Sequence, residues 1–379
     1  MTTSDYRPIG IPFIRGVNLA RGIFLEDEFV FVDNDKADDV QSANAVPGDL
    51  VFTRKGTIGQ VSMIPRNPRF PRYVISGSQM KARLDPALAV PEYYYYWFRS
   101  PEGQHALLSH MVTVGVPSLA NSLDTLRNIV VPHPPLGEQQ VIAALLGALD
   151  DKIAVNDRIA NTARALGISL FQSALEFADK EMEIGGIASL LTRGQTPKYT
   201  DAGNAVTVVN QKCVRDGRVN VGPARLAEAS RVKADRVLRK YDVLVNSTGV
   251  GTLGRVGIWS DERFATVDSH VTIIRIAPPL PAIIGGFALL AAEPEIEALG
   301  EGSTGQTELS RSKLSSLTVR IPADGIEGLA RQITGLELRA DAALIESKTL
   351  AALRDTLLPE LMSGRLRVKD AEKVVEDAV

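Results

Sequence analysis

The sequence has little of what metal sites, disulfides and membrane spans require. Its 379 residues include one cysteine, Cys213, which has no partner for an internal disulfide. The four histidines show no metal-ligand spacing. The longest apolar run, residues 283–292, is ten residues with two glycines, so no membrane span is predicted. No apolar segment of signal-peptide length begins the chain, and we expect a cytoplasmic protein.

An excess of positive charge is also missing. The formal net charge is −3 and the pI is about 5.9, which argues mildly against a free-standing DNA-binding protein. Two local clusters are nevertheless basic. The first cluster has no acid within it and comprises Arg66, Arg69, Arg72, Lys81 and Arg83. The second also contains the acids Glu228 and Asp235, and its basic residues are Arg225, Arg231, Lys233, Arg236, Arg239 and Lys240. A solvated face and a nucleic-acid contact remain equal alternatives for both clusters.

Recognisable catalytic motifs are absent as well. The sequence has no Walker A, H-E-x-x-H or G-x-S-x-G motif. Residues 249–254 match G-x-G-x-x-G, but a dinucleotide site needs a helix to begin at the glycines, and residues 255–259 have a strand pattern. We therefore predict a tight turn there, and the residues alone indicate no catalytic residues, cofactor or metal.

Two long amphipathic segments dominate the sequence that is present. Apolar residues recur every three or four positions in residues 134–179, which predicts a helix of roughly 65 Å at about 1.5 Å per residue. Residues 325–363 have the same pattern, with Pro359 or Gly364 as alternative end points. Helices of this length favour a strut between domains, and two matched ones can form an antiparallel coiled coil. The predicted pairing residues are Leu145, Leu149, Ile153, Ile159, Leu166, Leu336, Ala343, Leu350 and Leu357.

The segments that precede the two helices resemble each other. Residues 49–61 match 242–256, residues 14–22 match 209–217, and the offset stays near 190–195. This indicates duplication of a domain together with its helix, and not a short-period solenoid. Short β-rich runs predict strands at 50–53, 58–64, 242–246, 255–259 and 271–276, while the aromatic residues 93–98 predict a short helix that packs in the core.

The expected fold is therefore α+β, with two similar, mostly-β domains separated by two long antiparallel helices. The predicted boundaries are 1–133 and 180–322 for the domains, and 134–179 and 323–379 for the helices and tail. Residues 183–196 have no counterpart before Tyr6. Three explanations stay open: the first domain lacks its opening strand, the start lies upstream, or another part of the chain fills that place.

The predicted turns carry side chains that hydrogen-bond base edges and phosphates. By composition alone, ordinary polar turns are the stronger alternative. The candidate DNA-binding residues are Arg15, Asn18, Thr53, Arg54, Lys55, Thr57, Ser78 and Gln79 in the first domain, and Gln211, Lys212, Asn246, Ser247, Thr248, Thr252, Ser269, His270, Thr304 and Gln306 in the second.

The borders of the helices carry a resemblance to a known family. Residues 134–142 (PPLGEQQVI) and 148–153 (ALDDKI) resemble the central conserved region of the specificity subunits of type I restriction–modification systems. Residues 357–366 (LLPELMSGRL) are similar to the end of their distal conserved region. Residues 11–16, 48–52 and 56–59 resemble segments of their target-recognition domains.

This resemblance implies a non-catalytic subunit of an adenine-specific DNA methyltransferase and endonuclease complex. Each domain would read one half of a bipartite site in double-stranded DNA, with the helices as a ruler. The helices would also hold methyltransferase subunits, two copies being expected, and restriction/translocase subunits would join them. Two alternatives remain: a coiled-coil adaptor with duplicated protein-binding domains, and an enzyme that binds a nucleotide at residues 249–254.

Overall fold

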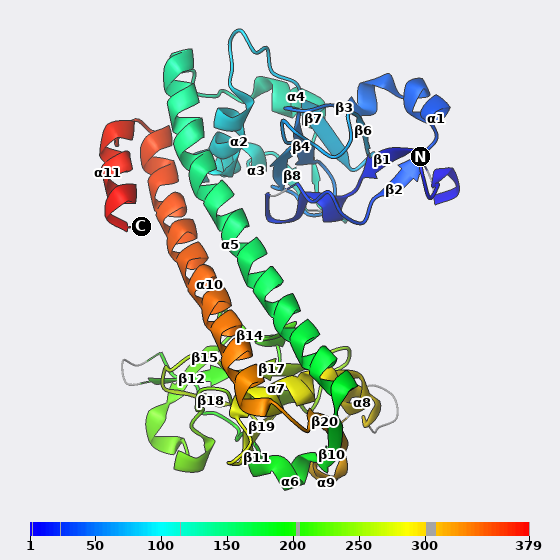
Figure 1. Cartoon of the computed structure of the whole chain (residues 1–379). Helices are drawn as coiled ribbons and strands as arrows, with labels where there is room; N and C mark the ends of the chain where they lie inside the picture. Colours follow the sequence, from blue (N-terminus) through cyan, green and yellow to red (C-terminus); the bar gives the residue numbers. More distant parts are fainter. Residues whose placement is uncertain (2, 23, 114, 202–204, 301–307, 379) are drawn as a thin grey trace. The chain divides into compact units, whose positions relative to one another are not determined.

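The computed structural model describes residues 1, 3–22, 24–113, 115–201, 205–300 and 308–378 (Figure 1). The chain forms two compact units: Met1–Val155 with Glu346–Val379, and Asn156–Ile345. Two long helices, α5 (Leu136–Phe177) and α10 (Ile326–Met362), each contribute one end to each unit. No helix in the described ranges is long and apolar enough to cross a membrane.

Several strands of the second unit lie where the sequence pattern predicts them. The observed β16 and β19 coincide with two predicted strands to within one residue, and β17 lies inside a third. Its main sheet has the order β11 (Ala188–Arg193), β19 (Val271–Ile276), β16 (Val243–Asn246), β17 (Val256–Ile258), β14 (Gly217–Val219), β13 (Val214–Arg215). Further sheets join β15 (Arg225–Glu228), β12 (Ala205–Val209) and β18 (Ala265–Val267), and β10 (Asp179–Glu183) with β20 (Thr318–Pro322).

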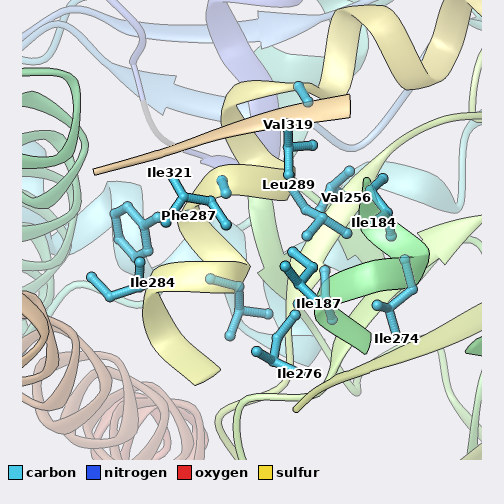
Figure 2. Close-up of a cluster of buried hydrophobic side chains, with 14 of the residues drawn as sticks. Ile184, Ile187, Val256, Ile274, Ile276, Ile284, Phe287, Leu289, Val319 and Ile321 are labelled. Carbon is cyan, nitrogen blue, oxygen red and sulfur yellow. The ribbon is translucent and has the colours of Figure 1, made fainter. Parts of the chain in front are cut away.

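Short helices cover one face of that main sheet. They are α6 (Ile184–Ile187), α7 (Ala282–Ala291), α8 (Glu293–Ala298) and α9 (Arg311–Ser316). Figure 2 shows Ile184 and Ile187 of α6 beside Ile274 and Ile276 of β19, with Phe287 of α7 in the same cluster. Burial of these large apolar side chains is the main force that holds α6 and α7 on the sheet.

The first unit has smaller sheets. They are β5 (Val61–Met63), β4 (Leu50–Thr53), β7 (Gln79–Ala82); then β2 (Val30–Val32), β1 (Ile11–Ile14), β6 (Tyr73–Ile75), β3 (Asn44–Ala45); and the pair β8 (Met111–Val112), β9 (Ser118–Leu119). The helices are α1 (Asn34–Asp39), α2 (Pro91–Arg99), α3 (Pro101–Leu108), α4 (Ser122–Asn128) and α11 (Val368–Ala378). Short 3-10 helices lie at Thr3–Asp5, Gly16–Gly22, Gln41–Ala43, Ala229–Arg231 and Ala234–Arg236.

The aromatic run packs in the core, as predicted. It forms α2, which begins at Pro91, and Tyr93, Tyr94, Tyr96, Trp97 and Phe98 are all buried. The phenol of Tyr96 donates to Asp150 of α5 over 2.8 Å. Because these rings are enclosed by protein, they are not platforms on which bases could stack.

The strand pairings of the two units repeat. In the first, β4 lies antiparallel between β5 and β7, and β1 pairs in parallel with β6. In the second, β16 lies antiparallel between β17 and β19, and β12 pairs in parallel with β18. The two units differ at one edge of this sheet. In the second unit β11 pairs with β19, whereas in the first unit no strand among the described residues pairs with the outer edge of β7.

Within each unit, α5 and α10 pack antiparallel. In the first unit, the hydroxyl of Ser347 donates to the carbonyl of Ile153 (3.5 Å), and Leu149, Leu350 and Leu357 share one core cluster. In the second, Ala160, Ala163 and Ala340 form a cluster that Leu336 flanks. Ala160, which is later in α5 than Ile153, lies with Ala340, which is earlier in α10 than Ser347, and this requires opposite helix directions. Small alanines allow the close approach in the second unit.

One predicted pairing residue departs from expectation. Leu166 is 48 % exposed, so its side chain lies largely in solvent and not between the helices. At about 100° per residue, Leu166 falls roughly a third of a turn away from the centre of the buried arc formed by Ala160, Ala163 and Phe171. The second helix passes through Pro359 to Met362, and Gly364 follows it with φ +71°. The alternative with Gly364 beyond the end is therefore the correct one.

Candidate nucleic-acid interface

The turn that follows β4 places two predicted residues, Arg54 and Lys55, at the end of the sheet. The backbone N–H of Arg54 donates to the carbonyl of Ser78 (2.9 Å), and the carbonyl of Arg54 accepts from Leu119 N–H (3.0 Å). The Arg54 guanidinium donates from Nε to Gly77 O (2.9 Å). Arg54 is thus held half-buried, whereas Lys55 is exposed.

Two open hollows of the first unit meet at Arg54. One, of about 400 Å³, is lined by Lys55, Ser118, Asn121 and Ser122 as well as Arg54. The other, of about 500 Å³, is lined by Arg54 together with Ser76, Gln79, Lys81 and Arg127 among others. Sequence reasoning missed Ser118, Asn121, Ser122 and Arg127. They come from β9 and α4, which reach the turn through the bridge between Lys55 and Ser118, and no local signal marks them.

The equivalent turn of the second unit follows β16. The backbone N–H of Ser247 donates to the carbonyl of His270 (2.8 Å), and its carbonyl accepts from Leu309 N–H (2.9 Å). Thr248 and His270 meet through Oγ1 and Nδ1 at 2.7 Å. The Ser247 hydroxyl lies 2.6 Å from Oγ1 of Thr272 and is buried.

These hydrogen bonds form one skeleton in two copies. Arg54 N–H to Ser78 O matches Ser247 N–H to His270 O, and the bond from Leu119 matches that from Leu309. A side chain closes each neighbouring turn, since Ser76 Oγ accepts from Ser78 N–H (3.3 Å) and Asp268 Oδ1 accepts from His270 N–H (2.9 Å). The backbone is therefore repeated, while the side chains at equivalent places differ: Arg54 against Ser247, Lys55 against Thr248, Ser78 against His270.

The other candidate residues divide by burial. Thr57, Lys212 and His270 are exposed, as are Lys55 and Ser78; Arg15, Gln211, Thr252 and Ser269 are half-buried. Asn18, Thr53, Gln79, Asn246 and Ser247 are buried. The amide of Asn18 bonds to Leu25 O (3.2 Å) and Asp27 O (2.9 Å), which favours a structural role. Thr304 and Gln306 lie outside the described residues.

Two buried amides keep unused hydrogen-bonding capacity. Asn246 donates from Nδ2 to Gln211 O (3.0 Å), but its Oδ1 has no partner in the described part of the chain. Gln79 accepts from Ser76 N–H through Oε1 (3.0 Å), and its Nε2 similarly has no described partner. These residues border the turns at Ser247 and Arg54, and buried polar atoms without a partner are unusual in folded proteins.

The first basic cluster is largely neutralised by acids from elsewhere in the chain. Arg83 forms a bidentate ion pair with Asp49. Arg72 lies 2.6 Å from Asp38, and Arg66 pairs with Glu92. Burial lowers the pKa of Lys81, and the neighbouring Asp49 opposes that shift. This cluster is therefore mainly a set of ion pairs, with Lys81 at a hollow beside Arg54.

The glycine sequence at residues 249–254 forms the turn between antiparallel β16 and β17, as predicted. Gly249, Gly251 and Gly254 have φ of +105°, +70° and +81°, which side chains rarely tolerate. No helix begins at these glycines, so the arrangement required for a dinucleotide pyrophosphate is not formed. Among the described residues no cluster suited to a metal ion occurs.

Comparison with known proteins agrees with this arrangement. Residues 6–164 match the family model of the type I restriction modification DNA specificity domain. Over 399 aligned residues the chain is 20 % identical to a putative type I restriction enzyme MjaX specificity subunit of Methanocaldococcus jannaschii, with 95 % of this chain and 88 % of the relative covered. The crystal structure of the S subunit of a type I restriction–modification system from M. genitalium matches with a TM-score of 0.59 at 15 % identity, covering 95 % of this chain and 91 % of that one.

Both the family model over residues 6–164 and the relative aligned over most of the chain make this chain similar to type I restriction–modification specificity subunits. The likeness to the M. genitalium structure shows that it has the fold of such a subunit, so the predicted fold class is confirmed. The relative that matches over most of the chain is named as a specificity subunit.

Proposed function

We propose that each globular domain of this chain reads one half of a bipartite site in double-stranded DNA. The first domain would do so through Arg54 and Lys55 with the neighbouring hollows, and the second through Thr248 and His270. One observation carries the proposal: the same backbone hydrogen bonds present different side chains in the two domains. A duplicated scaffold with diverged side chains at its turns is suited to recognise two different sequences.

The side chains at these turns fit different kinds of base. Arginine and lysine donate to the O6 and N7 acceptors of guanine in the major groove. Threonine and histidine can both donate and accept, which allows contact with either base of a pair. The turn residues are exposed or half-buried, and Arg54 is fixed at its Nε by Gly77 O. A donor that is already fixed loses less side-chain entropy on binding, so it binds a matching acceptor more tightly than a mobile donor does.

We further propose that α5 and α10 hold the methyltransferase subunits, two copies being expected, with restriction/translocase subunits joining them. Large apolar side chains remain exposed along both helices: Val141, Val155 and Leu166 on α5, and Leu338 and Ile345 on α10. Exposed apolar residues in a helical row support a protein-binding surface. The mild acidity of the chain fits a complex in which the partners share the contacts to phosphate.

Long-read methylation mapping tests the function directly. DNA from cells that make this chain with its methyltransferase partner is compared with DNA from cells that lack only this chain. A bipartite methylated motif that disappears with the chain is the expected result. If the partner is active and bound but no methylation depends on the chain, the adaptor alternative would replace DNA recognition.

A further inference from the structure

A separate hollow of about 590 Å³ lies in the second unit, beside the recognition turn. Thr192 and Arg193 of β11 line it, together with Gly194, which follows β11. The other lining residues are Arg236, Glu308, Ser310 and Arg311. Glu308 forms a bridge with Thr248, so the hollow adjoins the turn that carries the proposed base contacts. Three guanidinium groups therefore line one open space.

The charges around this hollow do not cancel. Glu308 is the sole acid among its described lining residues, and it pairs with Arg193. Arg236 contacts the amide oxygen of Gln195 at 3.4 Å, which leaves its charge uncompensated by that contact. Arg311 is exposed and forms no ion pair with a described residue. Three positive charges against one negative leave the lining with a net charge of +2.

Two of the arginines that line the hollow also each carry a buried donor without an acceptor in the described structure. Arg193 donates from one terminal nitrogen to Leu309 O (2.5 Å) and pairs with Glu308 through the other, yet its buried Nε has no described partner. The buried Nε of Arg236 likewise has no described hydrogen-bond partner. Buried N–H groups without acceptors are rare and costly, and two at one hollow point to an acceptor that comes from outside the chain.

The hollow depends on the segment that has no counterpart in the first domain. Thr192 and Arg193 belong to β11, which pairs with β19. Gly194 follows at a close approach, where a Cβ would lie 2.1 Å from the carbonyl oxygen of Asp268. In the first unit no described strand occupies the equivalent place beside β7. The three-arginine hollow is thus a feature of the second domain.

We propose that Arg193, Arg236 and Arg311 bind a backbone phosphate of DNA, in support of the reading function proposed above. Guanidinium groups match the geometry of phosphate oxygens and donate in pairs to them. A phosphate contact positions the DNA but carries no sequence information. The hollow would therefore set how the duplex lies against the turn at Thr248 while leaving the choice of bases to that turn.

The variants Arg311→Gln and Arg236→Gln test this in the complete methyltransferase complex. Binding to a DNA that carries the mapped motif is measured by fluorescence anisotropy over a range of salt concentrations. Loss of one phosphate contact should lower the slope of log K against log salt by about 0.9 and weaken specific and non-specific DNA alike. The methylated motif should not change. Arg263→Gln, which removes the same charge from an exposed residue paired with Asp261, serves as the control.

A methylphosphonate scan of the DNA backbone then identifies the phosphate. One neutralised phosphate should weaken binding of the unaltered chain but cause little further loss in Arg311→Gln. Unchanged slopes in both variants, with normal binding by the unaltered complex, would overturn the phosphate site and leave the proposed function standing. A changed motif would assign the arginines to bases, and loss of subunit assembly without a change in slope would assign them to a protein partner. If the unaltered complex binds no specific DNA, the proposed function itself is wrong.

Discussion

Arg275 donates two hydrogen bonds to Asp242, from Nε to Oδ1 at 2.9 Å and from a terminal nitrogen to Oδ2 at 2.7 Å. The first unit repeats the arrangement between Arg83 and Asp49, at 2.7 and 2.8 Å. Each aspartate also accepts the backbone N–H three residues before it, from Arg239 at 2.8 Å or Val46 at 3.0 Å. The pair therefore fixes the approach to β16 and to β4, the strands that lead to the turns at Ser247 and Arg54.

We predict that Arg275→Ala destabilises the protein more than Arg83→Ala. The side chains of Arg275 and Asp242 are 13 % and 2 % exposed, so removal of the arginine leaves a buried carboxylate unpaired, at a cost of about 3–5 kcal/mol. Arg83 is 56 % exposed, and Lys81 stays 3.8 Å from Asp49 as a second cation. Urea unfolding of both variants, with Arg263→Ala as an exposed control, measures the difference. Equal losses would show that the buried position does not matter.

The buried pair between the helices should behave as a unit. Arg164 of α5 lies 2.5 Å from Glu337 of α10, and both are buried. Glu337→Leu should cost about 3–5 kcal/mol because it leaves the arginine charge unpaired, whereas the double variant Arg164→Met with Glu337→Leu should recover much of that loss. Thermal unfolding of the two singles and the double gives the coupling energy. Additive losses would contradict the coupling.

Substitutions at the two turns should change different halves of the recognised sequence. Arg54→Gln should relax one half, and Thr248→Val should relax the other, each by about 1–3 kcal/mol of base discrimination. Methylation mapping of each variant complex reports both halves in one measurement. A change of both halves in either variant would falsify the modular arrangement.

The stability of the second unit should depend on pH through Asp268. Burial is the main cause that raises the pKa of this carboxyl, while the N–H of His270 opposes the shift. A raised pKa means that the folded state favours the protonated acid, so this group contributes stability at acid pH and loses it as pH rises through the folded pKa. Asp268→Asn keeps an acceptor for His270 N–H without the charge. Compared with the original protein, this variant should gain stability at pH 7 and little or none near pH 4 in urea unfolding. An equal effect at both pH values would contradict the linkage.

The chain by itself should bind DNA weakly at physiological salt. Its net charge is −3, and many of its basic side chains are engaged in ion pairs. Addition of the methyltransferase subunits should raise the affinity for motif DNA by supplying further phosphate contacts. Anisotropy with and without the partner measures this, and tight specific binding by the isolated chain would refute the shared-contact explanation.

Much of the fold could be predicted because its signals are local or periodic. The predicted strands 50–53 and 271–276 match the structure to the residue, and the two long helices match it to within two residues at each end. The internal repeat revealed the duplication because both copies keep the same turn pattern. Leu166 was misjudged because a stripe of apolar residues is broader than the narrow face that packs, and Gly167, which approaches Phe287, carries part of that face without any apolar side chain.

The site was harder to predict because long-range contacts assemble it. Arg66 and Glu92 are 26 residues apart, and nothing near the basic cluster revealed the acids that neutralise it. Similarly, Asn121 and Arg127 reach Arg54 only after β9 pairs beside Lys55. Turn position and side-chain type found the centre of each turn, but the surrounding residues required the tertiary structure.

The hydrogen bonds that hold the turns at Arg54 and Ser247 run chiefly between backbone atoms. Arg54 bonds in this way with Ser78 and Leu119, and Ser247 with His270 and Leu309. The scaffold of each turn therefore does not depend on which side chains it displays. Substitutions at the exposed positions of these turns, such as Lys55 and His270, usually alter stability by no more than about 0.5 kcal/mol. If these turns read the DNA as proposed, point mutations in one domain can change its half of the recognised sequence while the fold is kept.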